Sequence, residues 1–89
     1  MTYELQVERA ARKDLSRLPE GDYRRIEMAI DALSAEPRPR GARKLRGAAN
    51  GWRLRVGEYR VMYAVFDKER LVKILRIRRR TTTTYEVLG

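Results

Sequence analysis

Arginines on two neighbouring strand-like segments are the residues best suited to chemistry in this sequence. Arg53 and Arg55 alternate with apolar residues, a Gly57-Glu58 pair follows, and Arg60 lies in the next apolar segment. Because side chains alternate between the two faces of a strand, Arg53 and Arg55 share one face. Guanidinium groups on a rigid sheet are well suited to binding phosphates through paired hydrogen bonds. We therefore predict a polyanion-binding site on this hairpin.

Two further basic stretches flank the hairpin. The preceding one contains Arg38, Arg40, Arg43, Lys44 and Arg46, and the following one contains Arg76, Arg78, Arg79 and Arg80, with Tyr85 beyond it. The candidate RNA-binding residues among them are Arg43, Lys44, Arg46, Arg76 and Arg78. Two interpretations remain open, because these cations either are solvated on a loop and an open sheet face or contact phosphates.

The charge is distributed unevenly along the 89 residues. Residues 1–36 contain six basic and eight acidic residues, a net charge of −2, whereas residues 37–89 contain fifteen basic and four acidic residues, a net charge of +11. A charge polarised in this way favours a nucleic acid or an acidic protein as the partner of the C-terminal part. A membrane surface is disfavoured because no long basic amphipathic helix is present.

Several chemistries are excluded by composition. The chain has neither cysteine nor histidine, which removes disulfides, thiolate chemistry, the commonest general base and the commonest metal ligand. We expect no cofactor and no metal. No apolar run approaches the length of a membrane span, and the N-terminus does not resemble a signal peptide, so we expect a cytoplasmic protein.

Hydrophobic periodicity divides the chain into short elements. It predicts a strand over 2–7, a helix over 8–18, a second helix over 23–35 with Asp22 as its N-cap, and strands over 52–56, 59–66 and 71–77. The segment from 36 to 51 is expected to be a loop anchored by Leu45, because Pro37 and Pro39 favour an extended path. Residues 81–89 are expected to form either a short helix on the sheet edge or a frayed end.

These elements predict a single α+β domain over residues 1–89. The order is strand-helix-helix-strand-strand-strand, with two helices packed on one side of a four-stranded, largely antiparallel sheet. The strand over 59–66 is apolar on both faces and should therefore be central. Buried aromatic residues, with Trp52 a core residue in preference to a stacking platform, would supply much of the core.

Taken together, these features resemble the RelE/ParE toxin superfamily. The resemblance rests on the element order, on the segments Lys44–Gly47, Trp52–Arg55 and Glu58–Tyr63, and on the arginine-rich final strand followed by a tyrosine. It covers nearly the whole chain. No single segment is diagnostic, but their combination in this order is specific, and the chain is most similar to RelE-type mRNA interferases.

The resemblance implies a toxin of a type II toxin–antitoxin system. RelE-type members are ribosome-dependent endoribonucleases that cleave mRNA in the A site of the 70S ribosome and so inhibit translation. ParE-type members share the fold, lack the catalytic set and act on DNA gyrase. Both kinds bind a co-encoded antitoxin, here expected to be acidic and RelB-like, in a hetero-oligomer. A basic nucleic-acid-binding module or a degenerate toxin is a third possibility.

The RelE-type active residues can be carried over position by position. Arg53 and Arg55 match two basic residues of the first hairpin strand, Arg60 matches an arginine of the second, and Tyr85 matches a C-terminal tyrosine. A late arginine is also required. Counting back from Tyr85 selects Arg79, whereas aligning the strand through Ile77 selects Arg80, and both remain candidates.

The sequence departs from the family at the general base. Well-known members have lysines where this chain has Arg53 and Arg55, and an arginine effectively cannot lose its proton. Glu58 is the nearest carboxylate in the hairpin and is a poor candidate in a turn. The implied reaction is attack of a ribose 2′-hydroxyl on the adjacent phosphate without a metal. Clustered guanidinium groups would stabilise its transition state, with water, ribosomal RNA or Tyr85 as proton acceptor.

Overall fold

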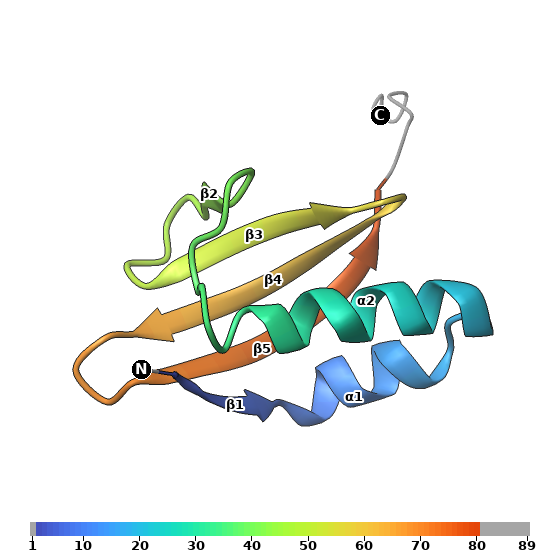
Figure 1. Ribbon diagram of the computed structural model, residues 1–89. Coiled ribbons are helices and arrows are strands. Elements are labelled where there is room, and N and C mark those ends of the chain that lie inside the picture. Colours follow the sequence, from blue (N-terminus) through green and yellow to red (C-terminus); the bar gives the residue numbers. More distant parts are fainter. Residues whose placement is uncertain (1, 81–89) are drawn as a thin grey trace.

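The computed structural model describes residues 2–80 and has two helices lying on one face of a twisted sheet (Figure 1). The strands are β1 (Glu4–Val7), β2 (Arg43–Lys44), β3 (Gly51–Val56), β4 (Tyr59–Phe66) and β5 (Leu71–Arg79), and the helices are α1 (Arg9–Ser16) and α2 (Glu20–Ala32). The predicted α+β class and element order are confirmed. Neither helix is long and apolar enough to cross a membrane.

The sheet has the strand order β1-β5-β4-β3-β2. β1 pairs with β5 in parallel, and the other three pairs are antiparallel. The sheet therefore has five strands where four were predicted, because β2 lies in the segment that was expected to be a loop. β4 is the middle strand, as its apolar residues on both faces predicted.

A tight reversal between residues 45 and 51 creates the additional strand. The amide of Leu45 donates to the carbonyl of Gly51 (2.9 Å), and the amide of Gly51 donates to the carbonyl of Ala48 (3.1 Å). A Cβ atom at Gly51 would lie only 2.8 Å from the Cβ of Ala48, so glycine permits this close approach. The reversal places Arg43 and Lys44 antiparallel to Arg53 and Trp52, where they add two residues to the sheet edge.

The second helix begins three residues earlier than predicted. α2 starts at Glu20 with Pro19 as its N-cap, so the predicted N-cap, Asp22, lies within the first turn. The ring of Pro19 fixes a φ that is compatible with the start of a helix. Acidic side chains in the first turn stabilise the helix by interacting favourably with the positive end of its dipole. Asp22 has a different role, since its Oδ2 accepts a hydrogen bond from the hydroxyl of Tyr59 (3.1 Å).

The core lies between the helices and the strands β4 and β5. Its buried members are Ala11, Ile26, Ile30 and Leu33 from the helical segment and Tyr59, Val61, Tyr63, Val65, Val72, Ile74 and Ile77 from the sheet. Trp52, Leu54 and Val56 pack against this cluster from β3. The predicted division of the hairpin is therefore confirmed, because these three residues face the helices while the intervening arginines project to the other side.

Candidate nucleic-acid interface

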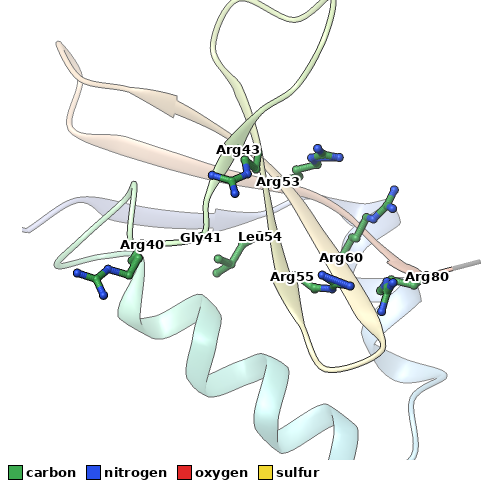
Figure 2. Close-up of a pocket in the computed structure, with 8 residues that line it drawn as sticks. All are labelled: Arg40, Gly41, Arg43, Arg53, Leu54, Arg55, Arg60 and Arg80. Atoms are coloured by element: carbon green, nitrogen blue, oxygen red, sulfur yellow. The ribbon is translucent and has the colours of Figure 1, made fainter.

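Six arginines line a cavity of about 350 Å³ beside the β3–β4 hairpin (Figure 2). Its lining comprises Arg40, Gly41, Arg43, Arg53, Leu54, Arg55, Arg60 and Arg80. Among residues 2–80, no carboxylate lines this cavity. The ion pairs formed within the same range involve Arg24, Arg38 and Arg76, and none of the six lining arginines. The cavity is therefore a concentration of positive charge suited to a polyanion.

The hairpin positions two of these arginines in one row. Arg55 of β3 and Arg60 of β4 are paired in register, so their side chains start from the same sheet face. The turn between them contains Gly57 with φ +59°, a positive φ of the kind that tight two-residue hairpin turns require. A Cβ atom at Gly57 would lie 2.5 Å from Nη1 of Arg25, so the hairpin tip packs closely against α2. The Arg25 side chain therefore lies against the backbone of the hairpin turn.

The structure places only one of the two late arginines in the cavity. Arg80 lines it, and its backbone amide donates to the carbonyl of Glu58 (2.6 Å). Arg79 pairs in register with Tyr59, and its guanidinium carbon lies 5.9 Å from the centre of the Tyr59 ring. Because adjacent strand residues face opposite sides, the end of β5 directs Arg79 toward the helical layer and leaves Arg80 beside the hairpin.

Arg76 lies apart from the cavity and stabilises the edge of β5. Its Nε donates to Oδ2 of Asp14 (2.8 Å) and its Nη2 donates to Oδ1 (3.2 Å). The same carboxylate accepts the backbone amide of Ile77 (2.9 Å), which lies beyond the part of β5 that pairs with β1. These interactions, with the Arg76 hydrogen bond foremost, hold the pKa of Asp14 below its ordinary value. The arrangement of Arg76 is that of an internal ion pair, although it was a candidate RNA contact.

Of the other candidate contacts, Arg43 lines the cavity, whereas Lys44, Arg46 and Arg78 lie outside its lining. Lys44 donates a hydrogen bond to the carbonyl of Ala49 and lies 5.7 Å from the centre of the Trp52 ring. Arg46 is exposed on the reversal that follows β2. Arg78 is exposed and pairs in register with Arg60, which puts it on the same open face of the sheet. Tyr85 lies outside the described residues.

The connection from α2 to β2 forms the second wall of the cavity through Arg40, Gly41 and Arg43. Two contacts attach its beginning to the sheet. The hydroxyl of the fully buried Tyr63 donates to the carbonyl of Pro37 (2.7 Å), and Nη2 of Arg38 donates to Oδ1 of Asp67 (2.8 Å). Burial raises the pKa of Tyr63 to about 12, so this hydroxyl remains a donor throughout the physiological range.

Arg40 is the arginine of the cavity lining that was not among the candidate contacts. It belongs to the basic Pro-Arg-Pro-Arg-Gly stretch, and the sequence alone left that stretch as either a solvated loop or a phosphate-binding loop. The signal that identifies it is Gly41, which follows directly and adopts φ +96°. Few residues other than glycine adopt this conformation readily, so it marks an ordered bend in place of a flexible loop.

Comparison with known proteins identifies the family. The family model described as ParE toxin of type II toxin-antitoxin system, parDE, matches residues 5–83. A RelE1 protein of Methanocaldococcus jannaschii, described as a candidate toxin, is 29% identical over 83 residues, which cover 90% of this chain and 92% of that protein. Both matches span nearly the whole chain.

Solved structures agree with this assignment. A chain in the crystal structure of the archaeal RelE–RelB complex from Pyrococcus horikoshii OT3 is 36% identical with a TM-score of 0.82, covering 93% of this chain and all of that one. A chain in the RelBE2 toxin–antitoxin complex from Mycobacterium tuberculosis is 34% identical with a TM-score of 0.77, and the match covers 90% of this chain and 100% of that one. This chain therefore belongs to the RelE/ParE superfamily, the toxins of type II toxin–antitoxin systems.

Proposed function

We propose that this toxin is a ribosome-dependent endoribonuclease that cleaves mRNA in the A site of the 70S ribosome and so inhibits translation. The observation that carries the proposal is that Arg53, Arg55, Arg60 and Arg80 line one cavity. These residues match the two basic residues of the first hairpin strand, the arginine of the second strand and one of the two candidates for the late arginine. The family resemblance implies that gyrase-binding members lack this set, so its presence here favours the ribonuclease.

The chemistry follows from the charge. The ribose 2′-oxygen loses its proton to a base and attacks the adjacent phosphorus. The bond from phosphorus to the 5′-oxygen breaks, and the 5′-oxygen takes a proton from water, giving a 2′,3′-cyclic phosphate and a 5′-hydroxyl. Negative charge accumulates on the phosphorane oxygens in the transition state, where Arg55, Arg60 and Arg80 would stabilise it more than in the ground state. No step requires a metal.

The proton acceptor is assigned outside these arginines. Because a guanidinium stays charged, neither Arg53 nor Arg55 acts as the base. Water, ribosomal RNA or Tyr85 takes the proton. Base catalysis of this kind accelerates a reaction by roughly 100- to 10,000-fold. The rest of the rate enhancement comes from orientation of the 2′-oxygen on the ribosome and from stabilisation of the phosphorane. Tyr85 would align the RNA by stacking on a base.

We assign an acidic, RelB-like antitoxin as the partner of this toxin in the cell. The similar chains from Pyrococcus horikoshii and Mycobacterium tuberculosis were both solved in toxin–antitoxin complexes. The net charge of +11 on residues 37–89 would attract an acidic chain and accelerate its association.

A ParE-like inhibitor of DNA gyrase is the second candidate, favoured by the description of the matching family model. Expression of the toxin in cells separates the two. The ribonuclease assignment predicts arrested protein synthesis, with messages cut inside their coding regions as read by primer extension. Intact messages together with supercoiling defects would replace it with the gyrase assignment.

A further inference from the structure

The cavity has two arginine-lined ends. Arg55, Arg60 and Arg80 lie at the end near the hairpin turn, whereas Arg40 and Arg43 come from the connection between α2 and β3 (Figure 2). Arg53 belongs to both groups, because it is the register partner of Arg43 across the β2–β3 pair and lies two residues from Arg55. Arg53 and Arg55 are two residues apart on β3, a span of about 6.6 Å along a strand. The two ends of the cavity are therefore separate positions for an anion.

The end of the cavity formed by Arg40 and Arg43 has a well-anchored backbone. Its first residues are held by the Tyr63–Pro37 hydrogen bond (2.7 Å) and by the Arg38–Asp67 ion pair (2.8 Å). The amide of Ala42 donates to the carbonyl of Pro39 (2.9 Å), which closes a turn around Arg40. The wall ends in β2, whose residues pair with β3. Arg40 and Arg43 are therefore carried on backbone that is fixed on both sides.

The placement of Arg43 beside Arg53 is unfavourable without an anion. Arg43 and Arg53 are directly opposite one another on neighbouring strands, an arrangement in which like charges destabilise a sheet. Within residues 2–80, none of the carboxylates is paired with Arg40, Arg43 or Arg53. A phosphodiester bound between them would relieve the repulsion through charge-assisted hydrogen bonds.

We infer that Arg40 and Arg43 form a second phosphate subsite, which binds the phosphodiester next to the scissile one in a single-stranded RNA. The inference rests on the proposed function for the identity of the scissile end. The subsite holds the strand while the chemistry takes place at Arg55, Arg60 and Arg80. Arg40 and Arg43 are thus positioning residues for the substrate, and Arg53 bridges the two phosphates.

The test measures binding of fluorescent 2′-O-methyl oligoribonucleotides, which cannot be cleaved, to the isolated toxin. One probe carries a single internucleotide phosphate and a longer one carries four. Arg40→Ala/Arg43→Ala should weaken binding of the longer probe about tenfold at low salt and leave the single-phosphate probe unchanged. The slope of log affinity against log salt should fall by about 0.7, the value for one phosphate contact on a single strand.

A matched double variant controls for net charge. Arg9→Ala/Arg17→Ala removes the same two charges from α1, away from the cavity, and should change neither the slope nor the affinity for the longer probe appreciably. Arg40→Lys/Arg43→Lys should restore the slope, because charge is retained. Equal losses for both alanine double variants, or an unchanged slope for Arg40→Ala/Arg43→Ala, would overturn the subsite.

Cleavage assays keep this inference separate from the proposed function. With ribosome-bound mRNA, Arg40→Ala/Arg43→Ala should raise KM with kcat near wild type, because the scissile end is intact. If the wild-type toxin cuts mRNA but Arg40→Ala/Arg43→Ala binds the oligonucleotides as the wild type does, the proposed function stands and the subsite is wrong. If the wild-type toxin inhibits gyrase but Arg40→Ala/Arg43→Ala shows the predicted loss of oligonucleotide binding, the phosphate subsite stands and the ribonuclease function is wrong.

Discussion

Arg55 and Arg60 are paired directly across the β3–β4 hairpin, with two guanidinium groups projecting from one row of an open sheet face. Like charges in this position destabilise a sheet. In the proposed function this row binds phosphate, and the hairpin gives up part of its stability to keep it. The fold tolerates this cost because β4 is held on both sides and its opposite face is buried in the core.

Neutralising Arg60 should therefore separate stability from activity. Arg60→Gln removes the repulsion with Arg55, so we expect unfolding to become less favourable by about 0.5 kcal/mol. This corresponds to a rise in melting temperature of about 2–4 °C for a domain of this size. Cleavage of ribosome-bound mRNA should fall at least 100-fold. Arg60→Lys, which keeps the charge, is the control and should show no stabilisation. A variant that melts lower than wild type would contradict the repulsion argument.

The two late arginines should differ sharply. Arg80→Ala should reduce cleavage of ribosome-bound mRNA by about 100-fold or more, the loss typical of a transition-state charge contact, while its melting temperature stays near wild type. Arg79→Ala should retain most of the cleavage but lose up to about 1 kcal/mol of stability, because it removes the cation–π contact with Tyr59. Rate and melting curves of the two variants measure this directly. The reverse pattern would return the catalytic assignment to Arg79.

Lysine should be accepted at Arg53 and Arg55. Arg53→Lys and Arg55→Lys keep the charge and add a group that can release its proton, so cleavage should be at least that of the wild type. Arg53→Ala and Arg55→Ala should weaken association with ribosome-bound mRNA, most strongly at low salt. Single-turnover cleavage at a series of salt concentrations compares the four variants. Lysine variants as inactive as the alanine variants would show that guanidinium geometry is what these positions supply.

Asp14 should make stability depend on pH at the acidic end. Its pKa is lowered in the folded state, first by the Arg76 hydrogen bond and then by the amide of Ile77. Its contribution is therefore complete above the unfolded value of about 3.9 and is lost as pH falls through the folded value. Asp14→Asn should cost about 1–3 kcal/mol at pH 7.

Denaturant unfolding at several pH values tests the Asp14 prediction. The difference in unfolding free energy between wild type and Asp14→Asn should be constant from pH 7 to about pH 5 and should shrink below about pH 4. Glu20→Gln, which removes a carboxylate from an exposed pair with Arg24, is the control and should cost no more than about 0.5 kcal/mol. A difference that persists at acid pH would show that Asp14 acts through packing.

Much of the fold follows from periodicity. The strand over 59–66 could be placed centrally because both of its faces are apolar, and the hairpin turn could be located from Gly57. β2 could not be predicted from two exposed basic residues, since its pairing depends on the reversal at Gly51. The start of α2 was misplaced because Asp22 is a good N-cap residue by type, whereas its carboxylate bonds to Tyr59 instead.

Only part of the candidate site could be read from the sequence. Alternation along strands correctly grouped Arg53 and Arg55, and it extends to Arg60 through the short hairpin. The sequence left both Arg79 and Arg80 as candidates, because the two ways of aligning them disagree. Alternation could not be applied to these residues, since β5 ends two residues beyond its predicted limit. The partnership of Arg76 with Asp14 joins residues 62 positions apart, and no local pattern reports such a contact.

The most direct test of the central claim is the cleavage of a defined mRNA by purified toxin. The assay compares 70S ribosomes stalled with a chosen codon in the A site against the same mRNA without ribosomes. We predict one cut within the A-site codon, a 2′,3′-cyclic phosphate or 3′-phosphate end by mass spectrometry, and no cut in free mRNA. Loss of the cut in Arg60→Gln would tie it to the cavity. An mRNA that stays intact on ribosomes, together with inhibition of DNA supercoiling by gyrase, would contradict the account.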